Sequence, residues 1–352
     1  MRVDTGRGQE GVFCLEFFYY KFAVRARACG ARESGGGRRF FMKSNRYVSQ
    51  LVRRIAWGDL DEGYVRSIIE LAREEDVCGL GLAARPERGT DITTMTLAPG
   101  TRASANLVAR REMVVCGMGL VPLVLDVYSS HASDEPCRFE AAVSDGERVG
   151  RGAVLGRIEG GGRVMLQAER VMLNFIQRLS GVATETAKYV AALGASKTML
   201  LDTRKTTPCF RALEKYAFAC GGGYNHRMGL FDRVMLKDNH LACLGASSGS
   251  ALTGAVVAAR EANPGIPVEV EVDSLAQIPP ALDAEPDVIM LDNFSLSDLE
   301  RALKIIGDAA WTEASGGVNL DTLADIGRIG PDFVSSGAPI HSSLWIDIGL
   351  DD

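Results

Sequence analysis

The feature that most constrains the fold is a repeated order in the second half of the chain: a short apolar run, a polar cluster and a helix-like segment such as 255–262 or 296–306. The apolar runs, each a predicted β-strand, are 199–201, 234–236, 268–272, 288–291, 311–314 and 333–334. Strands and helices that alternate at intervals of roughly 20–35 residues predict parallel βαβ units. Because a closed α/β barrel has eight strands, these runs predict an incomplete, distorted α/β barrel.

The residues before these runs predict a smaller domain of mixed helix and strand. Apolar residues at helical spacing predict a helix over 48–75. Alternating residues separated by glycine turns predict short strands within 103–109, 113–115 and 138–158. Three glycines at 160–162 end this α+β sandwich, and a long helix is predicted from about Leu166 to Ala192.

These patterns divide the chain into three parts. The first residues are rich in Arg and contain the flexible stretch Gly35–Arg39, which predicts a disordered extension upstream of an alternative start at Met42. We assign 1–43 to this extension, 44–162 to the α+β sandwich domain and 163–352 to the barrel domain. The extreme C-terminus is expected to pack back on the sandwich domain.

Composition excludes several classes of partner. The chain of 352 residues holds 39 Lys and Arg against 45 Asp and Glu, so its net charge of −6 attracts neither nucleic acid nor an anionic membrane. No apolar run reaches the ~18–20 residues that span a bilayer. The eight cysteines include no Cys-x-x-Cys pair, and scattered thiols are typical of a reducing compartment. We therefore expect a cytoplasmic protein with no nucleic-acid or membrane partner.

Positive charge gathers locally despite the acidic total. Residues 202–240 hold seven Lys and Arg against four Asp and Glu, which is +3. Arg204, Lys205 and Lys237 follow predicted strands, and His226-Arg227 follow a glycine loop. Because chemistry in α/β barrels gathers at the carboxyl ends of the strands, these residues predict a pocket for carboxylate or phosphate groups. Three other cations are expected on solvated helix faces, namely Arg211, Lys215 and Arg233.

The later strand ends predict the opposite charge and a phosphate site. Glu271 and Asp292 each end an apolar run, and two carboxylates at one mouth can hold a divalent cation or the hydroxyls of a sugar. Glu269 has the same parity as Glu271, so either could face the site, and we favour Glu271. Ser315–Gly317 and Ser336–Ala338 offer small residues and backbone N–H groups, as phosphate loops of barrels do.

Several motifs, in order along the chain, resemble those of the quinolinate phosphoribosyltransferase family. Glu169–Asn174 and Leu179–Thr184 are similar to the family's ERxxLN…LSGIAT segment, and Asp91–Thr94 is similar to its early DxT turn. The other matching segments are 202–208 (DTRKTTP), 214–217 (EKYA), 221–227 (GGGYNHR), 237–240 (KDNH), 291–294 (LDNF), 313–317 (EASGG) and 347–351 (DIGLD). The resemblance extends from about residue 48 to the end of the chain.

The resemblance implies the fold of a type II phosphoribosyltransferase and a defined reaction. Members of the family join quinolinate to phosphoribosyl pyrophosphate with Mg²⁺. They release pyrophosphate and CO₂ and leave nicotinate mononucleotide for NAD biosynthesis. The family's counterpart of Arg170 reaches the neighbouring subunit's site, so the resemblance also implies a homodimer or higher homo-oligomer with Arg170 supplied in trans.

The resemblance assigns roles to individual residues. It implies that Lys205, Lys237, Glu271 and Asp292 are catalytic and that the two carboxylates meet the ribose and the metal, directly or through Mg²⁺. The cations would hold the pyridine dicarboxylate and the pyrophosphate. The implied substrate-binding residues are Arg170, Thr203, Arg204, Lys205, His226, Arg227, Lys237, Glu271, Asp292, Ser315, Gly316, Gly317, Ser336, Gly337 and Ala338.

Two positions depart from the family's pattern. Cys209 stands where the family usually has glycine after Thr-Thr-Pro. Ala338–His341 reads Ala-Pro-Ile-His where the family commonly has Ala-Leu-Thr-His, and Pro339 removes a backbone N–H beside the expected phosphate loop.

Three other functions are compatible with parts of the sequence. A molybdenum-associated paralogue of the same fold would act on a related substrate, but Arg170 and His226-Arg227 argue against it. A Schiff-base aldolase would use Lys205 or Lys237, yet such a lysine needs an apolar setting and both lie among charged groups. A catalytically silent anion-binding protein would release no CO₂ when it is given both substrates.

Overall fold

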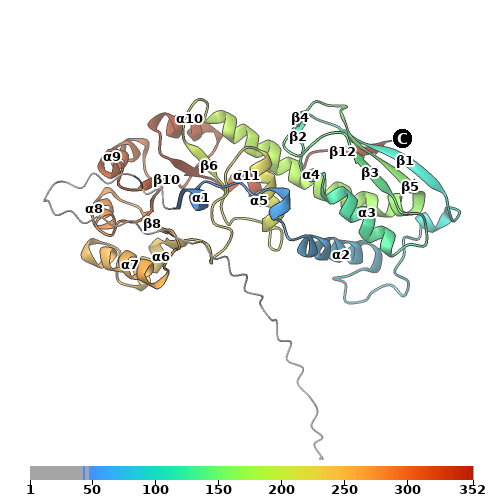
Figure 1. Ribbon diagram of the computed structural model, residues 1–352, viewed down its shortest axis with the longest axis horizontal. Helices are drawn as coiled ribbons and strands as arrows, with labels where there is room; N and C mark the ends of the chain where they lie inside the picture. Colours follow the sequence, from blue (N-terminus) through green and yellow to red (C-terminus); the bar gives the residue numbers. More distant parts are fainter. Residues whose placement is uncertain (1–42, 44–46, 352) are drawn as a thin grey trace, which may run out of the picture. The chain divides into compact units, whose positions relative to one another are not determined.

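The computed structural model describes residue 43 and residues 47–351, which belong to one compact unit (Figure 1). Apart from Lys43, the extension expected over 1–43 lies outside the described residues. No helix in the described part of the chain is long and apolar enough to cross a bilayer.

An antiparallel sheet of four strands, in the order β12-β1-β5-β3, forms the centre of the smaller domain. Its strands are β1 (Arg102–Ala109), β3 (Arg138–Ala141), β5 (Val154–Gly161) and β12 (Ile348–Asp351), while β2 (Met113–Val114) pairs separately with β4 (Arg148–Val149). The last strand of the chain, β12, pairs with β1 from Asn106↔Asp351 to Ala109↔Ile348. The C-terminus therefore adds a strand to the sheet of the smaller domain.

The prediction of a single helix over 48–75 is wrong, because two helices occupy this region. They are α1 (Val48–Leu51) and α2 (Glu62–Cys78), with a 3-10 turn, η2 (Trp57–Asp59), between them. The side chain of Asp61 accepts a hydrogen bond from the backbone N–H of Tyr64 at 2.9 Å. This N-cap starts α2 at Glu62 and prevents its extension toward α1.

Helix α4 (Gly162–Ala192) begins at the glycine run and passes from the smaller domain to the barrel. It starts four residues before the expected Leu166 because Gly162 already has helical geometry. Its buried residues include the consecutive run Leu179–Ala183, which spans more than one helical turn, so the middle of the helix is enclosed on all sides. The helix packs against α2, α3 (Leu120–Ser130) and α5 (Arg211–Cys220) and also against strands of the smaller domain.

The six expected strands of the second half form one parallel sheet in the order β6-β11-β10-β9-β8-β7. They are β6 (Met199–Leu201), β7 (Val234–Leu236), β8 (Val268–Val272), β9 (Val288–Asp292), β10 (Trp311–Ser315) and β11 (Phe333–Ser335). All five pairings are parallel, and β6 and β7 remain the two edges within the described residues. The prediction of an incomplete α/β barrel is therefore confirmed.

Helices follow the strands, as the alternating pattern predicted. After β7 they are α6 (Asp238–Cys243), α7 (Gly249–Ala262), α8 (Ile278–Leu282), α9 (Leu296–Ile306), α10 (Leu320–Ile329) and α11 (Ala338–His341). Figure 1 shows α7 to α10 arranged around the outside of the sheet. The loops that leave the carboxyl ends of the strands carry most of the residues predicted for the site. Arg170 lies on α4, and His226 and Arg227 lie between α5 and β7.

Candidate active site

Asp202, the first residue after β6, organises two of the predicted loops. Its carboxylate is fully buried and accepts hydrogen bonds from the backbone N–H of His226 at 2.8 Å and from Asn225 Nδ2 at 2.7 Å. It also pairs with the ammonium group of Lys215 on α5. These bonds fix the loop that starts with Thr203 beside the loop that carries His226 and Arg227.

Two of the three cations expected on solvated helix faces are instead buried. Lys215 is 0% exposed because Asp202 compensates its charge, and Arg233 is 2% exposed because its guanidinium reaches Glu269 at 3.2 Å. Arg211 is half-buried and donates to the backbone oxygen of Met228 at 3.1 Å. These cations lie beneath the site and bind its loops. The prediction that Lys215 and Arg233 lie on solvated helix faces is therefore wrong.

Arg204, Lys205 and Arg227 form the positive part of the site. Arg204 and Lys205 are exposed after β6, whereas Arg227 is buried. Burial, followed by the positive charge of Arg204, lowers the pKa of Arg227. Two cations close enough to disfavour each other's charge are stabilised by an anion between them. This part of the site therefore suits a carboxylate or phosphate group.

The loops after β6 and β11 touch at Gly337. A Cβ atom at this position would lie 3.0 Å from Thr203 Oγ1, Lys205 Cδ and His341 Cδ2. The hydroxyl of Thr203 accepts the backbone N–H of Lys205 at 3.0 Å, which shapes the first loop from within. Glycine at 337 thus lets the expected phosphate loop approach the expected cation loop.

His226 lies in a buried ionic layer beneath this mouth. Its Nε2 atom is 3.2 Å from Glu269 Oε2 and 3.3 Å from Glu313 Oε2. Burial opposes ionisation of Glu269, but His226 and Arg233 lower its pKa to about 2. Burial and the charge of Glu269 raise the pKa of Glu313. The layer positions His226 from below, and sequence reasoning missed Glu313 and Arg233 as its partners.

Glu271 and Asp292 supply the carboxylates of the mouth. Glu271 is 7% exposed, and its Oε2 accepts a hydrogen bond from Lys237 Nζ at 2.5 Å. Asp292 ends the neighbouring strand β9 and accepts from Asn293 Nδ2 at 2.7 Å. Glu269 points into the layer of His226, so Glu271, not Glu269, meets Lys237. Carboxylate oxygens on adjacent strand ends are ligands of the kind that Mg²⁺ prefers, and the donor set fits that ion.

The two expected phosphate loops differ in backbone conformation and in the hydrogen bonds of their N–H groups. Gly316 has φ +88°, and a Cβ there would lie 2.2 Å from Asn293 Oδ1, so glycine is required where this loop passes β9. In the other loop, the N–H of Ser336 bonds to Leu201 O at 3.0 Å and that of Ala338 to Ser336 Oγ at 3.3 Å. Two backbone N–H groups of Ser336–Ala338 are therefore already hydrogen-bonded within the protein, and Pro339 has no backbone N–H.

Comparisons with known proteins match this geometry. The sequence matches the family described as quinolinate phosphoribosyl transferase, N-terminal domain, over residues 91–180 and the C-terminal domain of the same family over residues 182–351. The chain belongs to the quinolinate phosphoribosyltransferase family. It is 40% identical over 267 residues to a nicotinate-nucleotide pyrophosphorylase [carboxylating] of Mycobacterium leprae, which covers 75% of this chain and 91% of that protein.

Other members of the family give the same result. A quinolinate phosphoribosyltransferase [decarboxylating] of Nicotiana glauca is 36% identical over 302 residues, 81% of each chain. Among solved structures, the nicotinate-nucleotide pyrophosphorylase of Francisella tularensis superposes with a TM-score of 0.75 at 33% identity, covering 85% of this chain and 99% of that one. The quinolinate phosphoribosyltransferase fold thus extends over both the sandwich and the barrel.

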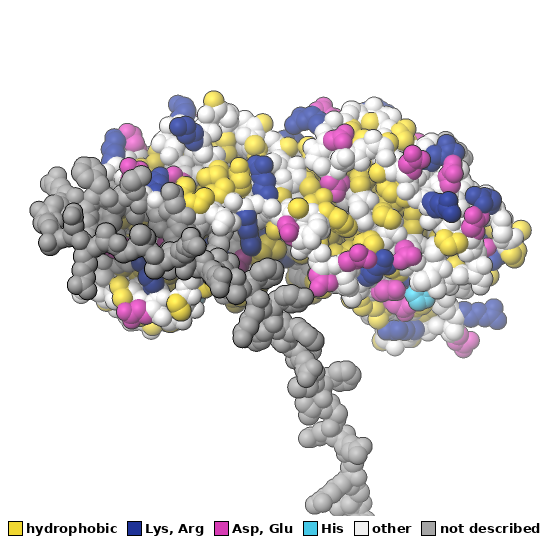
Figure 2. Space-filling model, viewed as in Figure 1, with side chains coloured by type: hydrophobic (Ala, Val, Ile, Leu, Met, Phe, Trp, Pro, Cys, Tyr) yellow, Lys and Arg dark blue, Asp and Glu magenta, His cyan; other side chains and the backbone are white. Residues whose placement is uncertain are grey.

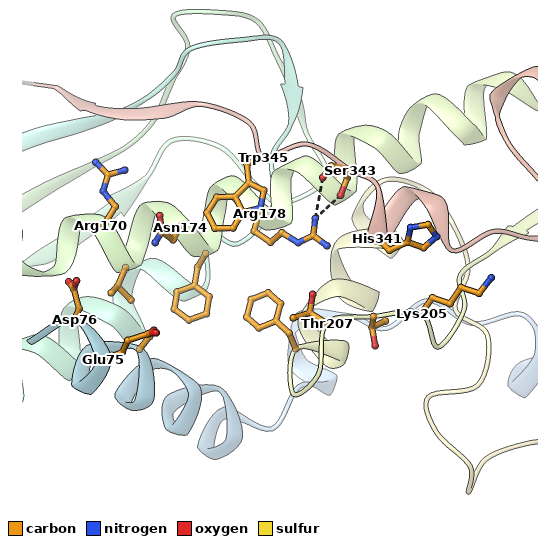
Figure 3. A pocket seen from close by; sticks show the side chains of 15 residues that line it. Glu75, Asp76, Arg170, Asn174, Arg178, Lys205, Thr207, His341, Ser343 and Trp345 are labelled. Carbon is orange, nitrogen blue, oxygen red and sulfur yellow. Dashed lines mark hydrogen bonds between the residues drawn. The ribbon is translucent and has the colours of Figure 1, made fainter. Parts of the chain in front are cut away.

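A groove of about 950 Å³ runs along α4 in this family member, beside the barrel mouth (Figure 3). Arg170 lies at one end of the groove, while Lys205 and His341 lie at the other. Of the predicted site residues, all of which the structure describes, Arg170 and Lys205 line it. Figure 2 shows apolar side chains gathered on the middle of one face of the molecule. The half-exposed Trp345 is one of the residues that line the groove.

Arg170, unlike the residues on the barrel loops, lies on α4 away from the barrel mouth. Its side chain is 62% exposed, and its nearest acid, Glu169, is 3.9 Å away. It precedes Arg178 by eight residues on α4, a rise of about 12 Å along the helix. The guanidinium is therefore free to meet an anion outside its own barrel.

A buried ion pair behind the cation loop was not predicted from the sequence. Arg178 donates to Glu214 Oε1 from Nη2 at 2.6 Å and from Nε at 3.1 Å. Glu214 also accepts the N–H and the hydroxyl of Thr207, each at 2.8 Å. Arg178 further donates to Ile340 O at 2.7 Å and to Ser343 Oγ at 2.8 Å. The pair ties α4, α5 and the loop of Lys205 to α11 and to the segment that follows it.

Proposed function

We propose that this protein transfers the phosphoribosyl group of phosphoribosyl pyrophosphate to quinolinate, forming nicotinate mononucleotide, CO₂ and pyrophosphate in NAD biosynthesis. The observation that carries the proposal is one barrel mouth with cations at Arg204, Lys205 and Arg227 and carboxylates at Glu271 and Asp292. The cations match a dicarboxylate and a pyrophosphate, and the carboxylates match ribose hydroxyls and a cation. The family membership of the chain supports the same reaction.

Each part of the site has a role in this reaction. Arg204 and Arg227 hold the quinolinate carboxylates, with Arg170 of a second chain. His226 positions Arg227, because its Nδ1 accepts the backbone N–H of Arg227 at 2.7 Å. Thr203 shapes the first loop through its bond to Lys205. Lys205 and Lys237 face the pyrophosphate, and the loops Ser315–Gly317 and Ser336–Ala338 receive the phosphate of the ribose unit. Arg227 is buried and Lys237 is paired with Glu271, so part of this charge is held in place before substrate arrives, which is how preorganised charge lowers a barrier.

The chemistry needs no covalent nucleophile from the protein. The pyridine nitrogen attacks the anomeric carbon, and the bond from that carbon to pyrophosphate breaks with its electron pair leaving on oxygen. The positively charged ring then accepts the electrons of the bond to the 2-carboxylate, which leaves as CO₂ while a proton takes its place. Lys205 and Lys237 stabilise the charge on the departing pyrophosphate.

Glu271 and Asp292 are the residues that would hold Mg²⁺. When bound, the ion supplies positive charge that neutralises the pyrophosphate of the substrate. The bond from Lys237 Nζ to Glu271 at 2.5 Å also argues against a Schiff-base aldolase, since the nucleophilic lysine of such an enzyme needs an apolar setting. We place the reaction in the cytoplasm, whose reducing conditions suit the six unpaired cysteines among the described residues.

We also propose that the active unit is a dimer in which Arg170 serves the partner's site. Its exposure, its position at the far end of the groove and its loose contact with Glu169 support this assignment. Arg170→Ala and Lys205→Ala chains, each inactive alone, should regain activity when they are unfolded and refolded together. With random pairing, half the dimers are mixed and each holds one intact site, so about a quarter of the parent activity returns.

The matched control for this experiment is a mixture of Lys205→Ala and Arg227→Ala chains. Both substitutions lie on the barrel of their own chain, so every site in a mixed dimer carries one of them and the mixture stays inactive. If the Arg170→Ala mixture is equally inactive although differently tagged chains copurify, Arg170 does not act in trans.

Pyrophosphate release with quinolinate or with nicotinate tests the reaction itself. The proposal predicts release with quinolinate and little with nicotinate, because nicotinate lacks the second carboxylate that the cations hold. The Lys205→Ala chain provides the background rate. Equal or greater release with nicotinate would contradict the assignment, and binding of both substrates without release would indicate an anion-binding protein.

A further inference from the structure

Two cysteines far apart in the sequence meet in the core, away from the barrel mouth. Cys116 follows β2, and Cys220 is the last residue of α5. Their sulfur atoms and a carboxylate oxygen of Asp145 all lie within 4.8 Å of one another. The turn of Asp145 packs on the end of α5, since a Cβ at Gly146 would lie 3.5 Å from Cys220 O.

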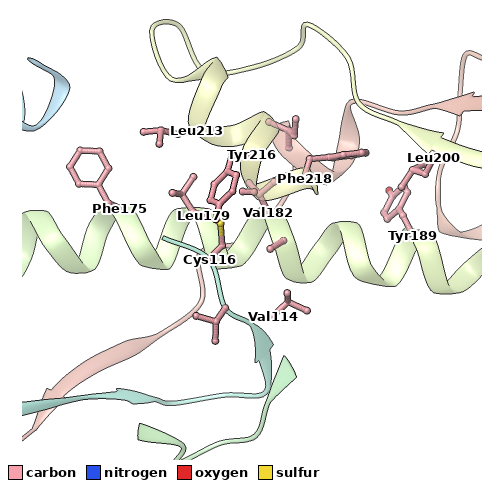
Figure 4. Packing of buried hydrophobic residues seen from close by; sticks show 14 of the residues in the cluster. Val114, Cys116, Phe175, Leu179, Val182, Tyr189, Leu200, Leu213, Tyr216 and Phe218 are labelled. Carbon is pink, nitrogen blue, oxygen red and sulfur yellow. The ribbon is translucent and has the colours of Figure 1, made fainter. Parts of the chain in front are cut away.

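The surroundings of the two thiols are different. Cys116 is 0% exposed and its backbone is held by the hydroxyl of Ser180 on α4, whereas Cys220 is half-buried. Figure 4 shows Cys116 beside Tyr216, with Leu179 and Val182 of α4 around them. Cys220 is therefore the more accessible of the two residues, and Cys116 is enclosed by the core.

The carboxylate of Asp145 is already used within the protein. Its Oδ1 accepts the N–H groups of Gly117 and Met118, each at 2.9 Å, and its Oδ2 accepts the hydroxyl of Tyr216 at 2.7 Å. A metal ion would have to displace these donors, and two thiols alone do not complete the four ligands of a structural zinc site. The arrangement favours chemistry between the two sulfurs over metal binding.

The protonation of the pair suits that chemistry. A hydrogen bond from Cys116 lowers the pKa of Cys220, although burial opposes this, and Tyr216 lowers it further. Burial raises the pKa of Cys116. The more accessible thiol is thus also the one that ionises first, and the thiolate is the form that reacts with peroxides.

We propose that Cys116 and Cys220 are an oxidation site that forms an intramolecular disulfide with hydrogen peroxide as the oxidant. The Cys220 thiolate attacks one oxygen of the peroxide, the O–O bond breaks, and a sulfenic acid and hydroxide form. The Cys116 sulfur then attacks the Cys220 sulfur, the S–O bond breaks, and water leaves with the remaining proton. The two thiols together lose two electrons, and one molecule of hydrogen peroxide accepts them and becomes two molecules of water.

The bridge would join two parts of the fold that bear on the site. Cys220 directly precedes Gly221–Gly223, which lead to His226 and Arg227. Gly221 has no room to move toward α4, because a Cβ there would lie 2.4 Å from Ala183 O. A bond from Cys220 to the segment after β2 would therefore fix the start of this loop from both sides.

Peptide mapping of the full-length protein tests the proposal. After treatment with peroxide and alkylation in denaturant, trypsin should release 112–138 joined to 216–227, and dithiothreitol should separate them. Because 112–138 also contains Cys137, the Cys137→Ala chain is the control that must keep the crosslink. Cys116→Ala and Cys220→Ser should each lose it, and circular dichroism checks that both remain folded.

Three results would overturn the proposal. The first is a crosslink that persists in Cys116→Ala, and the second is oxidation of Cys220 to sulfinic acid with Cys116 still alkylated. The third is protection of both thiols by one equivalent of Zn²⁺ added to the reduced protein, which would make the cluster a metal site. None of these readouts depends on catalytic activity, so they are independent of the proposed reaction.

Discussion

Glu214→Gln is expected to destabilise the protein strongly although the side chains have the same shape. The carboxylate of Glu214 is fully buried and accepts four hydrogen bonds, two from Arg178 and two from Thr207. A glutamine offers one oxygen and one NH₂ group in the same place. Its NH₂ must face a donor, either the guanidinium or the Thr207 backbone, so at least one bond is replaced by a repulsive contact.

The size of the effect follows from burial. The side chain of Arg178 is 13% exposed and that of Glu214 is 0% exposed, so solvent does not screen the pair. Removing one partner of a buried ion pair typically costs about 3–5 kcal/mol. Arg178 keeps its bonds to Ile340 O and Ser343 Oγ, which offset part of the loss. We therefore expect a loss of about 3 kcal/mol in the free energy of unfolding.

Urea unfolding of three variants measures this effect. Glu214→Gln should lower the unfolding free energy as stated, whereas Glu214→Gln combined with Arg178→Met should recover part of it because no unpaired charge remains. The control is Glu300→Gln, which breaks the exposed pair with Lys304 and should leave stability unchanged. A change below about 1 kcal/mol in Glu214→Gln would refute the reasoning, since it would mean that water already solvates the pair.

Three further outcomes are expected. Arg204→Ala and Arg227→Ala should weaken quinolinate binding by about 2–5 kcal/mol in calorimetry and phosphoribosyl pyrophosphate binding far less, and equal losses would contradict their assignment. Cys209 has φ +59°, so Cys209→Gly should raise the unfolding free energy by up to about 1 kcal/mol where Cys209→Ala does not, and a loss with glycine would show that the loop is not strained. Burial opposes ionisation of Asp232, but backbone N–H donors and a nearby Arg lower its pKa. The ionised carboxylate therefore stabilises the folded state at pH values above its unfolded pKa of about 4, and this stabilisation is lost as the pH falls through the lower folded pKa. The urea midpoints of Asp232→Asn and the parent should accordingly converge between pH 7 and pH 3, and a constant gap would refute this.

The barrel could be predicted from the sequence because its strands are short, buried on both faces and each followed by polar residues. These signals are local and they recur, so six strands were found at the correct places. The break between α1 and α2 was missed, although Asp61 before the apolar spacing is an N-cap signal that could have revealed it. The spacing of apolar residues does not show where a helix begins, because the N-cap is a polar residue.

The strand-end residues of the site could also be predicted, whereas their supports could not. The carboxyl ends of parallel strands lie at one edge, so Lys237 and Glu271 meet in space as a consequence of topology. The burial of Lys215 depends on a charge 13 positions away, and that of Glu214 on Arg178, 36 positions away. A count of charges along the chain does not indicate such partners, because they are set by how α5 packs against α4 and against the end of β6.

The central claim is that one pocket binds a pyridine dicarboxylate, couples it to the ribose unit and removes one carboxylate. The most direct test follows quinolinate labelled with ¹³C at the 2-carboxylate while pyrophosphate is measured in the same reaction. The account predicts one labelled CO₂ for each pyrophosphate and an unlabelled nicotinate mononucleotide. Label retained in the nucleotide, or pyrophosphate released without CO₂, would contradict it.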